Sequence, residues 1–218
     1  MQSNQISFEV EGPVAMFTRP DTGSTPVSYP VPTYSAAKAM FECVARRPHI
    51  YIHPTRVEVC RPVRYERYVT NYGGPLRKAD QLKKDNNYQL FATVLVDVCY
   101  RIYAEVRGKA SSTRGASREQ VRRRRGRDWR PEFRRLFEDR LARGQTFFTP
   151  CLGWKEFVPR YFGPLREGTV PESSVNLVIP ALLHSMWEHR QLKPVFRQDW
   201  HVVKGVMSYE LRRPDHVE

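Results

Sequence analysis

The stretch "YQLFATVLVDVCYRIYAEV", residues 88–106, is strongly β in character, and the fold is best worked out from it. Its even-numbered positions are mostly Leu, Val, Tyr or Ile, which is the alternation of a strand with one buried face. A typical strand has about 5–6 residues, so this one is unusually long. We therefore predict that it bends or divides into two pieces.

Strand signals stand on both sides of this segment. Ile6, Phe8 and Val10 alternate with polar residues and predict a half-buried strand. The run over residues 49–69 also has β character, and Pro62 predicts an interruption in it. Residues 145–158, "QTFFTPCLGWKEFV", are predicted to be a strand as well.

Two helices are predicted between these strands. The first begins after Thr33, a suitable N-cap, and ends before Pro48. Its apolar residues recur at helical spacing at Ala37, Met40, Phe41 and Val44. The second begins with Pro131 as its first residue and ends at Gly144. Its buried stripe is predicted to contain Phe133, Leu136, Phe137 and Leu141.

The resulting order is β-α-β followed by β-α-β. This order predicts an α+β fold with a ferredoxin-like βαββαβ domain of the RNA-recognition type. We assign residues 1–158 to this domain. Residues 159–218 contain several short β-like pieces and are predicted to form a C-terminal β-rich extension.

Composition narrows the class of protein. Hydrophobic residues make up 40% of the 218, as in a globular chain with a core. No run of 18 apolar residues is present, and the first residues lack the pattern of a signal peptide. The four cysteines are far apart and form no C-x-x-C pair, which argues against a zinc site or a disulfide framework. We expect a cytoplasmic protein without membrane contact.

The net charge of +13 is the strongest functional signal, with 36 basic against 23 acidic residues. Twelve of the 28 arginines lie between positions 114 and 143, and "VRRRRGRDWRP" occupies residues 121–131. Guanidinium groups match phosphate geometry and stack on bases, so this bias favours a nucleic-acid partner. We predict a phosphate-binding arm that leads into Trp129 and Arg130.

Histidine, lysine and tyrosine are side chains that can contact RNA and exchange protons with it. His49 and His53 lie roughly 13 Å apart if residues 49–53 form a strand, too far for one metal ion. They are predicted to line a face of the sheet instead. Tyr34 and Lys38 share one helix face and are either a solvent-facing pair or a phosphate contact beside an RNA channel. We identify no metal or cofactor site.

Two long motifs carry a family resemblance. They are "F-x-x-x-G-x-x-A-x-F-T-x-P", residues 8–20, and "S-Y-x-V-P-T-Y-x-A-x-K", residues 28–38; "PCLGWKEFV", residues 150–158, continues it. Together they resemble the CRISPR-associated proteins of family five, Dvulg subtype, from type I-C systems. The resemblance implies a metal-independent endoribonuclease that cuts the repeat hairpin of the CRISPR precursor RNA. It also implies that the protein keeps the 5′ handle of the mature guide RNA and joins the other subunits of the surveillance complex.

The catalytic positions of the family are replaced in this sequence. The tyrosine near the end of the first helix corresponds to Ala45, and the Lys-His pair at the second helix to Arg130-Pro131. Arginine can hold phosphate but does not exchange protons near neutrality. The catalytic candidates are Tyr34, Lys38, His49, His53 and Arg130. The candidate RNA contacts are Arg46, Arg47, Arg122, Arg123, Arg124, Arg125, Arg127, Trp129 and Lys155.

Three functional hypotheses follow. The first is an active ribonuclease whose acid and base have moved to other residues. The second is a structural subunit that caps the RNA handle without cutting it. The third is a general basic protein that also binds duplex DNA through its run of arginines. A 2′,3′-cyclic phosphate product formed in chelator would distinguish the first from the others.

Overall fold

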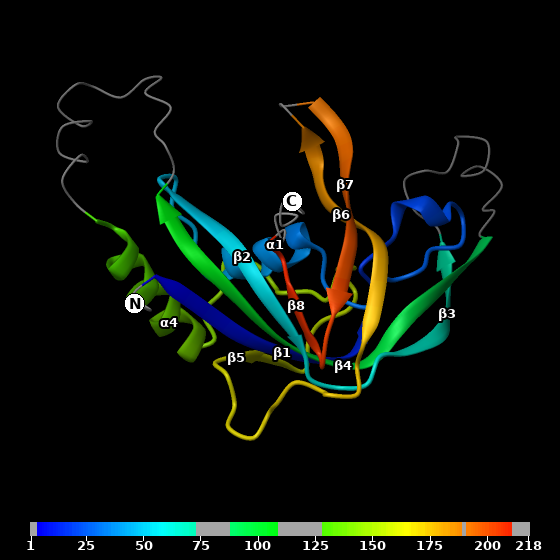
Figure 1. The fold of residues 1–218 in the computed structure, drawn as a ribbon, viewed down its shortest axis with the longest axis horizontal. Coiled ribbons are helices and arrows are strands. Elements are labelled where there is room, and N and C mark those ends of the chain that lie inside the picture. The colour runs from blue at the N-terminus through cyan, green and yellow to red at the C-terminus, as the bar shows by residue number, and fades with distance from the viewer. Residues whose placement is uncertain (1–3, 73–87, 109–127, 189–190, 211–218) are drawn as a thin grey trace, which may run out of the picture.

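The computed structural model describes residues 4–72, 88–108, 128–188 and 191–210 (Figure 1). The fold is mixed α and β, with mostly antiparallel strands and few helices. Its main elements in chain order are β1 (Gln5–Ala15), α1 (Tyr34–Val44), β2 (Ile50–Val59), β3 (Arg64–Tyr72), β4 (Tyr88–Gly108), α4 (Arg130–Ala142), β5 (Tyr161–Gly163), β6 (Leu177–Glu188), β7 (Gln191–Val202) and β8 (Val206–Ser208).

The long strand β4 organises the main sheet, in which the strand order is β5-β1-β4-β2-β8. Its second half lies between β1 and β2, while its first half pairs with β3. Asp97 has a φ of 51° in the middle of the strand, opposite the Gly12–Val14 step of β1. A positive φ is rare for a non-glycine residue and turns the backbone. The predicted bend is therefore confirmed.

The two helices pack against the sheet through aromatic contacts. The ring of Phe8 on β1 lies 4.6 Å from that of Phe41 on α1, which lies 5.6 Å from that of Phe137 on α4. The hydroxyl of Thr33 accepts a hydrogen bond from the Ala36 amide, which confirms the predicted cap. Phe133, Phe137 and Leu141 are buried as predicted. The prediction is wrong for Leu136, which is only partly buried because it lines a pocket.

The predicted strand over residues 145–158 is wrong. This segment contains turns instead, and Gly153 has a φ of +94°. The Leu152 amide donates to the Phe157 carbonyl and the Leu152 carbonyl accepts from Met16, so the backbone groups of Leu152 bond within a turn and to another loop. The next strand is β5, after residue 158. Helix α4 also begins one residue before Pro131.

The C-terminal residues contribute to two sheets. β5 pairs with β1, and β8 pairs with β2, so both belong to the main sheet. β6 and β7 form a separate two-stranded sheet that rises above α1 in Figure 1. No helix in the described part of the chain is long and apolar enough to cross a membrane.

Candidate functional site

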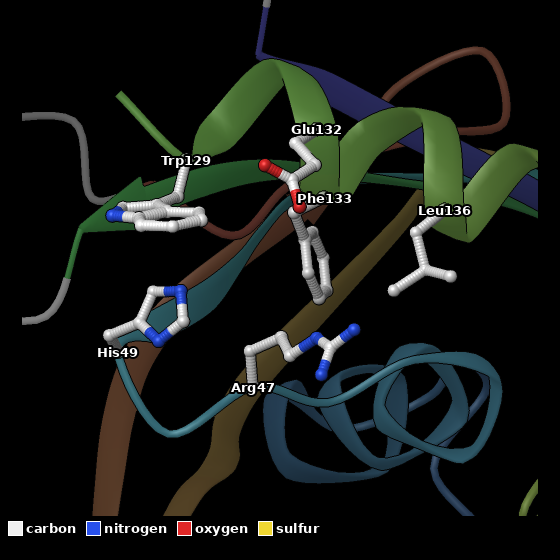
Figure 2. Close-up of a pocket in the computed structure, with 6 residues that line it drawn as sticks. All are labelled: Arg47, His49, Trp129, Glu132, Phe133 and Leu136. Atoms are coloured by element: carbon white, nitrogen blue, oxygen red, sulfur yellow. The ribbon is translucent and has the colours of Figure 1, made fainter. Parts of the chain in front are cut away.

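A pocket of about 330 Å³ lies where the end of α1 meets the start of α4 (Figure 2). It is lined by Arg47, His49, Trp129, Glu132, Phe133 and Leu136. The rings of His49 and Trp129 have centroids 5.4 Å apart. Figure 2 shows these two rings facing each other across the gap between α4 and the segment that leads into β2. We call this pocket of six residues the helix-junction pocket.

Local backbone geometry explains why these residues meet. After α1 ends, the Ile50 amide donates to the Arg47 carbonyl, which turns the chain into β2 with His49 in the turn. On the other wall, Trp129 is the N-cap residue of α4, and its carbonyl accepts a bond from the Phe133 amide. The contact between Phe41 and Phe137 holds the two helices together and so fixes the walls of the pocket.

The positions at which the family resemblance predicts catalytic residues, Ala45 and Arg130-Pro131, adjoin the pocket residues Arg47 and Trp129 in the sequence. Ala45 is fully buried and carries no reactive group. The Arg130 guanidinium makes a bidentate pair with Asp128, with N–O distances of 2.8 and 2.9 Å. The hydrogen bond raises the pKa of Arg130 and lowers that of Asp128. Arg130 therefore stays a fixed cation and offers no proton transfer.

Two other predicted residues, Tyr34 and His53, meet Tyr51 and His184 in a second group, which we call the tyrosine–histidine cluster. The Tyr34 hydroxyl lies 3.0 Å from that of Tyr51 and 2.7 Å from His53 Nδ1. The His184 ring packs against Tyr34 in a tilted arrangement, with the ring centroids 4.4 Å apart. Lys38 Nζ lies 4.3 Å over the Tyr51 ring. The solvent-facing alternative is wrong for Tyr34, which is 6% exposed.

Three members of the tyrosine–histidine cluster, Tyr34, His53 and His184, have pKa values shifted toward their neutral forms. Burial and the hydroxyl of Tyr51 raise the pKa of Tyr34 far above its ordinary value. Burial, with Arg107 nearby, lowers the pKa of His53. Burial and Arg197 lower the pKa of His184 to about 4. The Glu210 carboxylate faces His53 Nε2 at 3.9 Å, which favours a proton there and leaves Nδ1 to accept from Tyr34. Both nitrogens of His53 are therefore engaged.

The remaining predicted residues lie apart. Arg46 is exposed and adjoins pocket residue Arg47. Lys155 is exposed in the turn after α4, beside Trp154, whose indole donates to Thr18, and it lines neither site. Residues Arg122–Arg125 and Arg127 lie outside the described residues.

Sequence reasoning missed two residues of these sites. Glu132 is an ordinary acidic residue in the first turn of a helix as far as the sequence shows. His184 stands five residues before His189, a spacing that indicates at most a weak metal site. Nothing in that spacing indicates a contact with Tyr34, 150 residues away. Both contacts depend on how distant segments pack.

Comparison with known proteins adds to this geometry. The family Cas_Cas5d, described as "CRISPR-associated protein (Cas_Cas5)", matches residues 5–214. A curated relative is "CRISPR pre-crRNA endoribonuclease Cas5d" from Thermus thermophilus. It is 31% identical over 183 residues, or 84% of this chain and 73% of the relative.

Solved structures agree on the fold. A structure described as "Crystal Structure of CRISPR-associated Protein" has a TM-score of 0.69 at 20% identity, over 96% of this chain and 93% of that one. A chain of a "CRISPR RNA-guided surveillance complex" has a TM-score of 0.52 at 16% identity, over 93% and 91%. Since the family match spans nearly the whole sequence, the chain belongs to the Cas_Cas5d family of CRISPR-associated proteins.

Proposed function

We propose that the protein is a metal-independent endoribonuclease that cleaves CRISPR precursor RNA within the repeat hairpin. It then keeps the 5′ handle as a subunit of the type I-C surveillance complex. The name of the Thermus relative supports the activity, and the likeness to a surveillance-complex chain supports the subunit role. The observation that carries the proposal is the helix-junction pocket, where an imidazole, a guanidinium and an indole line one cavity.

The proposed reaction requires two proton transfers and a cation beside the phosphate. The 2′-hydroxyl loses a proton as its oxygen bonds to phosphorus, the bond to the 5′-oxygen breaks, and that oxygen takes up a proton. The products are a 2′,3′-cyclic phosphate and a 5′-hydroxyl. His49 transfers the protons, since imidazole exchanges them near neutral pH. Arg47 and Arg130 neutralise the phosphate, and Trp129 stacks a base.

The tyrosine–histidine cluster has a supporting role in this proposal. Tyr34 stays protonated, and both nitrogens of His53 have partners, so neither side chain is set to exchange protons. Tyr51 and His49 are two residues apart, roughly 7 Å along an extended chain. Tyr34, Lys38 and His53 therefore hold the start of β2, and with it His49, in place.

The assignment is tested with repeat-hairpin RNA in chelator. His49→Gln should cut at least about 100-fold more slowly, the usual size of a proton-transfer contribution, while it still binds the RNA. Tyr34→Phe removes one hydroxyl from the other site, which only helps to position His49, and it should slow cutting far less than His49→Gln does. Full loss in Tyr34→Phe with normal cutting by His49→Gln would transfer catalysis to the tyrosine–histidine cluster.

A second function is favoured by one observation, namely that Ala45 and Pro131 stand where the family has reactive side chains. A subunit that caps the handle without cutting would bind the hairpin tightly and release no cyclic phosphate. Equal affinity for random duplex DNA would instead favour the general basic protein. The same assay therefore separates all three hypotheses.

We also propose that the fold is ferredoxin-like and that its C-terminal extension begins after β5, not at residue 159 as predicted from the sequence. The order β5-β1-β4-β2, with α1 and α4 as the two crossovers, supports this topology. The fourth strand of the pattern is then β5, which lies just beyond residue 158. A crystal structure with the same strand order and connections would test it.

A further inference from the structure

Two adjacent phenylalanines stand exposed after α4. Phe147 is 64% exposed and Phe148 is 56% exposed. The backbone at Phe147 is held against α1, because the Phe147 amide donates to the Cys43 carbonyl at 2.7 Å. The Arg140 guanidinium lies 4.3 Å from the centre of the Phe147 ring. Large side chains held outward in this way indicate a surface that meets a partner.

The charge of this surface favours RNA over protein. A guanidinium stacked on an aromatic ring offers a flat plate beside a phosphate contact, the combination on which unpaired bases stack. Arg46 is exposed near the same end of α1. Within the described residues, no carboxylate forms a salt bridge with Arg46 or Arg140. An RNA strand supplies the negative charge that these two cations lack.

Phe147 lies along the same contact between α1 and α4 that forms the helix-junction pocket. Leu136 lines the pocket, and Arg140 follows it by four residues, so the two side chains share one face of α4. Arg140 Nε donates to the Val44 carbonyl at 2.6 Å, at the last residue of α1. The seam between the helices therefore runs from Trp129 past Leu136 to Arg140, a distance of about 16 Å at the rise of an α-helix. A few nucleotides of single strand fit along a seam of this length.

We propose that Phe147, Phe148 and Arg140 form a stacking site for an unpaired base of the RNA strand that leaves the helix-junction pocket. The site sets where the single-stranded flank of the repeat hairpin lies on the protein. This inference rests on the proposed function, which supplies the RNA. It adds a specificity for flanked over unflanked hairpins.

The experiment compares Phe147→Ala/Phe148→Ala with a matched variant, Val170→Ala/Val178→Ala, which trims two side chains of similar exposure elsewhere. Each is titrated with a repeat hairpin carrying single-stranded flanks and with the same hairpin without them. A 2′-deoxy sugar at the scissile position prevents cutting, so binding is measured independently of cleavage. Melting temperatures of both variants should equal that of the wild type.

We expect the phenylalanine variant to bind the flanked hairpin on the order of tenfold more weakly and the unflanked hairpin normally. A fluorescent base in the flank should also lose its stacking signal. Unchanged affinity for the flanked hairpin overturns the inference, as does an equal loss for both hairpins. Normal RNA binding with failed assembly into the complex would assign the surface to a protein subunit and overturn it too. Absence of cleavage by the wild type would refute the proposed function alone.

Discussion

Replacing Glu9 with glutamine tests the charge network that attaches the segment after β5 to the first strand. The side chain of Glu9 is fully buried. Its carboxylate accepts from the Arg166 amide at 2.9 Å, Arg166 Nε at 2.7 Å, Thr169 at 3.0 Å and Arg101 at 3.3 Å. Burial alone would raise the pKa of Glu9, but these hydrogen bonds outweigh it and hold the pKa below 4.5.

The loss of stability can be estimated because glutamine carries no charge and accepts hydrogen bonds through only one oxygen. Its amide nitrogen turns a donor toward groups that are already donors, and two guanidinium groups lose their shared charge. Removing one partner of a buried pair costs about 3–5 kcal/mol. Arg166 is 39% exposed and keeps Glu11, which lessens the cost. We expect Glu9→Gln to lose about 2–4 kcal/mol, or about 5–15 °C in Tm for a chain of this length.

The assay is thermal unfolding followed by circular dichroism between pH 3 and pH 7. The lowered pKa means that Glu9 stabilises the fold above pH 4.5 and loses this effect as the pH falls through its folded-state value. The difference between wild type and variant should therefore shrink below pH 4.5. Asp139→Asn, which breaks an exposed pair with Arg143, should cost less than about 1 kcal/mol. A Glu9→Gln melting point within about 2 °C of wild type at pH 7 would refute the reasoning.

Three further predictions concern other parts of the chain. Gly153→Ala should destabilise the fold by more than about 2 kcal/mol in denaturant titrations, because a Cβ there would clash with the Met16 carbonyl oxygen at a φ of +94°; an unchanged midpoint would contradict the geometry. His184→Phe keeps a ring against Tyr34 but removes a group whose pKa falls from 6.5 to about 4, so the unfolding free energy should decline less between pH 6.5 and pH 4 than in the wild type. Replacing Arg122–Arg125 with alanine should flatten the log-log salt dependence of RNA binding by about 3 units, and an unchanged slope would exclude the predicted arm.

The fold was predictable wherever local chemistry decides it. Thr33 as a cap, three of the four residues of the stripe on α4 and the length of β4 each depend on near neighbours, and each was confirmed. The segment over residues 145–158 was not predictable in this way. It is rich in aromatic and apolar residues, as many strands are, but its backbone bonds to the loop at Met16 and folds around Gly153. Only the packing of two distant segments decides between these outcomes.

For the candidate site, too, the sequence predicted the residues but not the distant segments that pack against them. Sequence reasoning named His49 and His53 together because they are four residues apart, yet they lie in different surroundings. His53 faces Tyr34, which the family motif also contains, whereas His49 faces Trp129, 80 residues away. Spacing along one strand says which residues share a face. It does not say which part of the chain will cover each of them.

Chemistry within the helix-junction pocket then limits what can replace the family's reactive residues. Of the six residues that line it, His49 carries the type of side chain that takes up and releases a proton near neutrality. An imidazole can serve both steps of the reaction, since it accepts the proton of the 2′-hydroxyl in one form and donates to the leaving oxygen in the other. The family resemblance predicts a tyrosine at the position two residues before Arg47 and a lysine at the position of Arg130. In the proposed mechanism, Arg47 and Arg130 still hold the phosphate, and proton transfer passes to His49, the residue before β2.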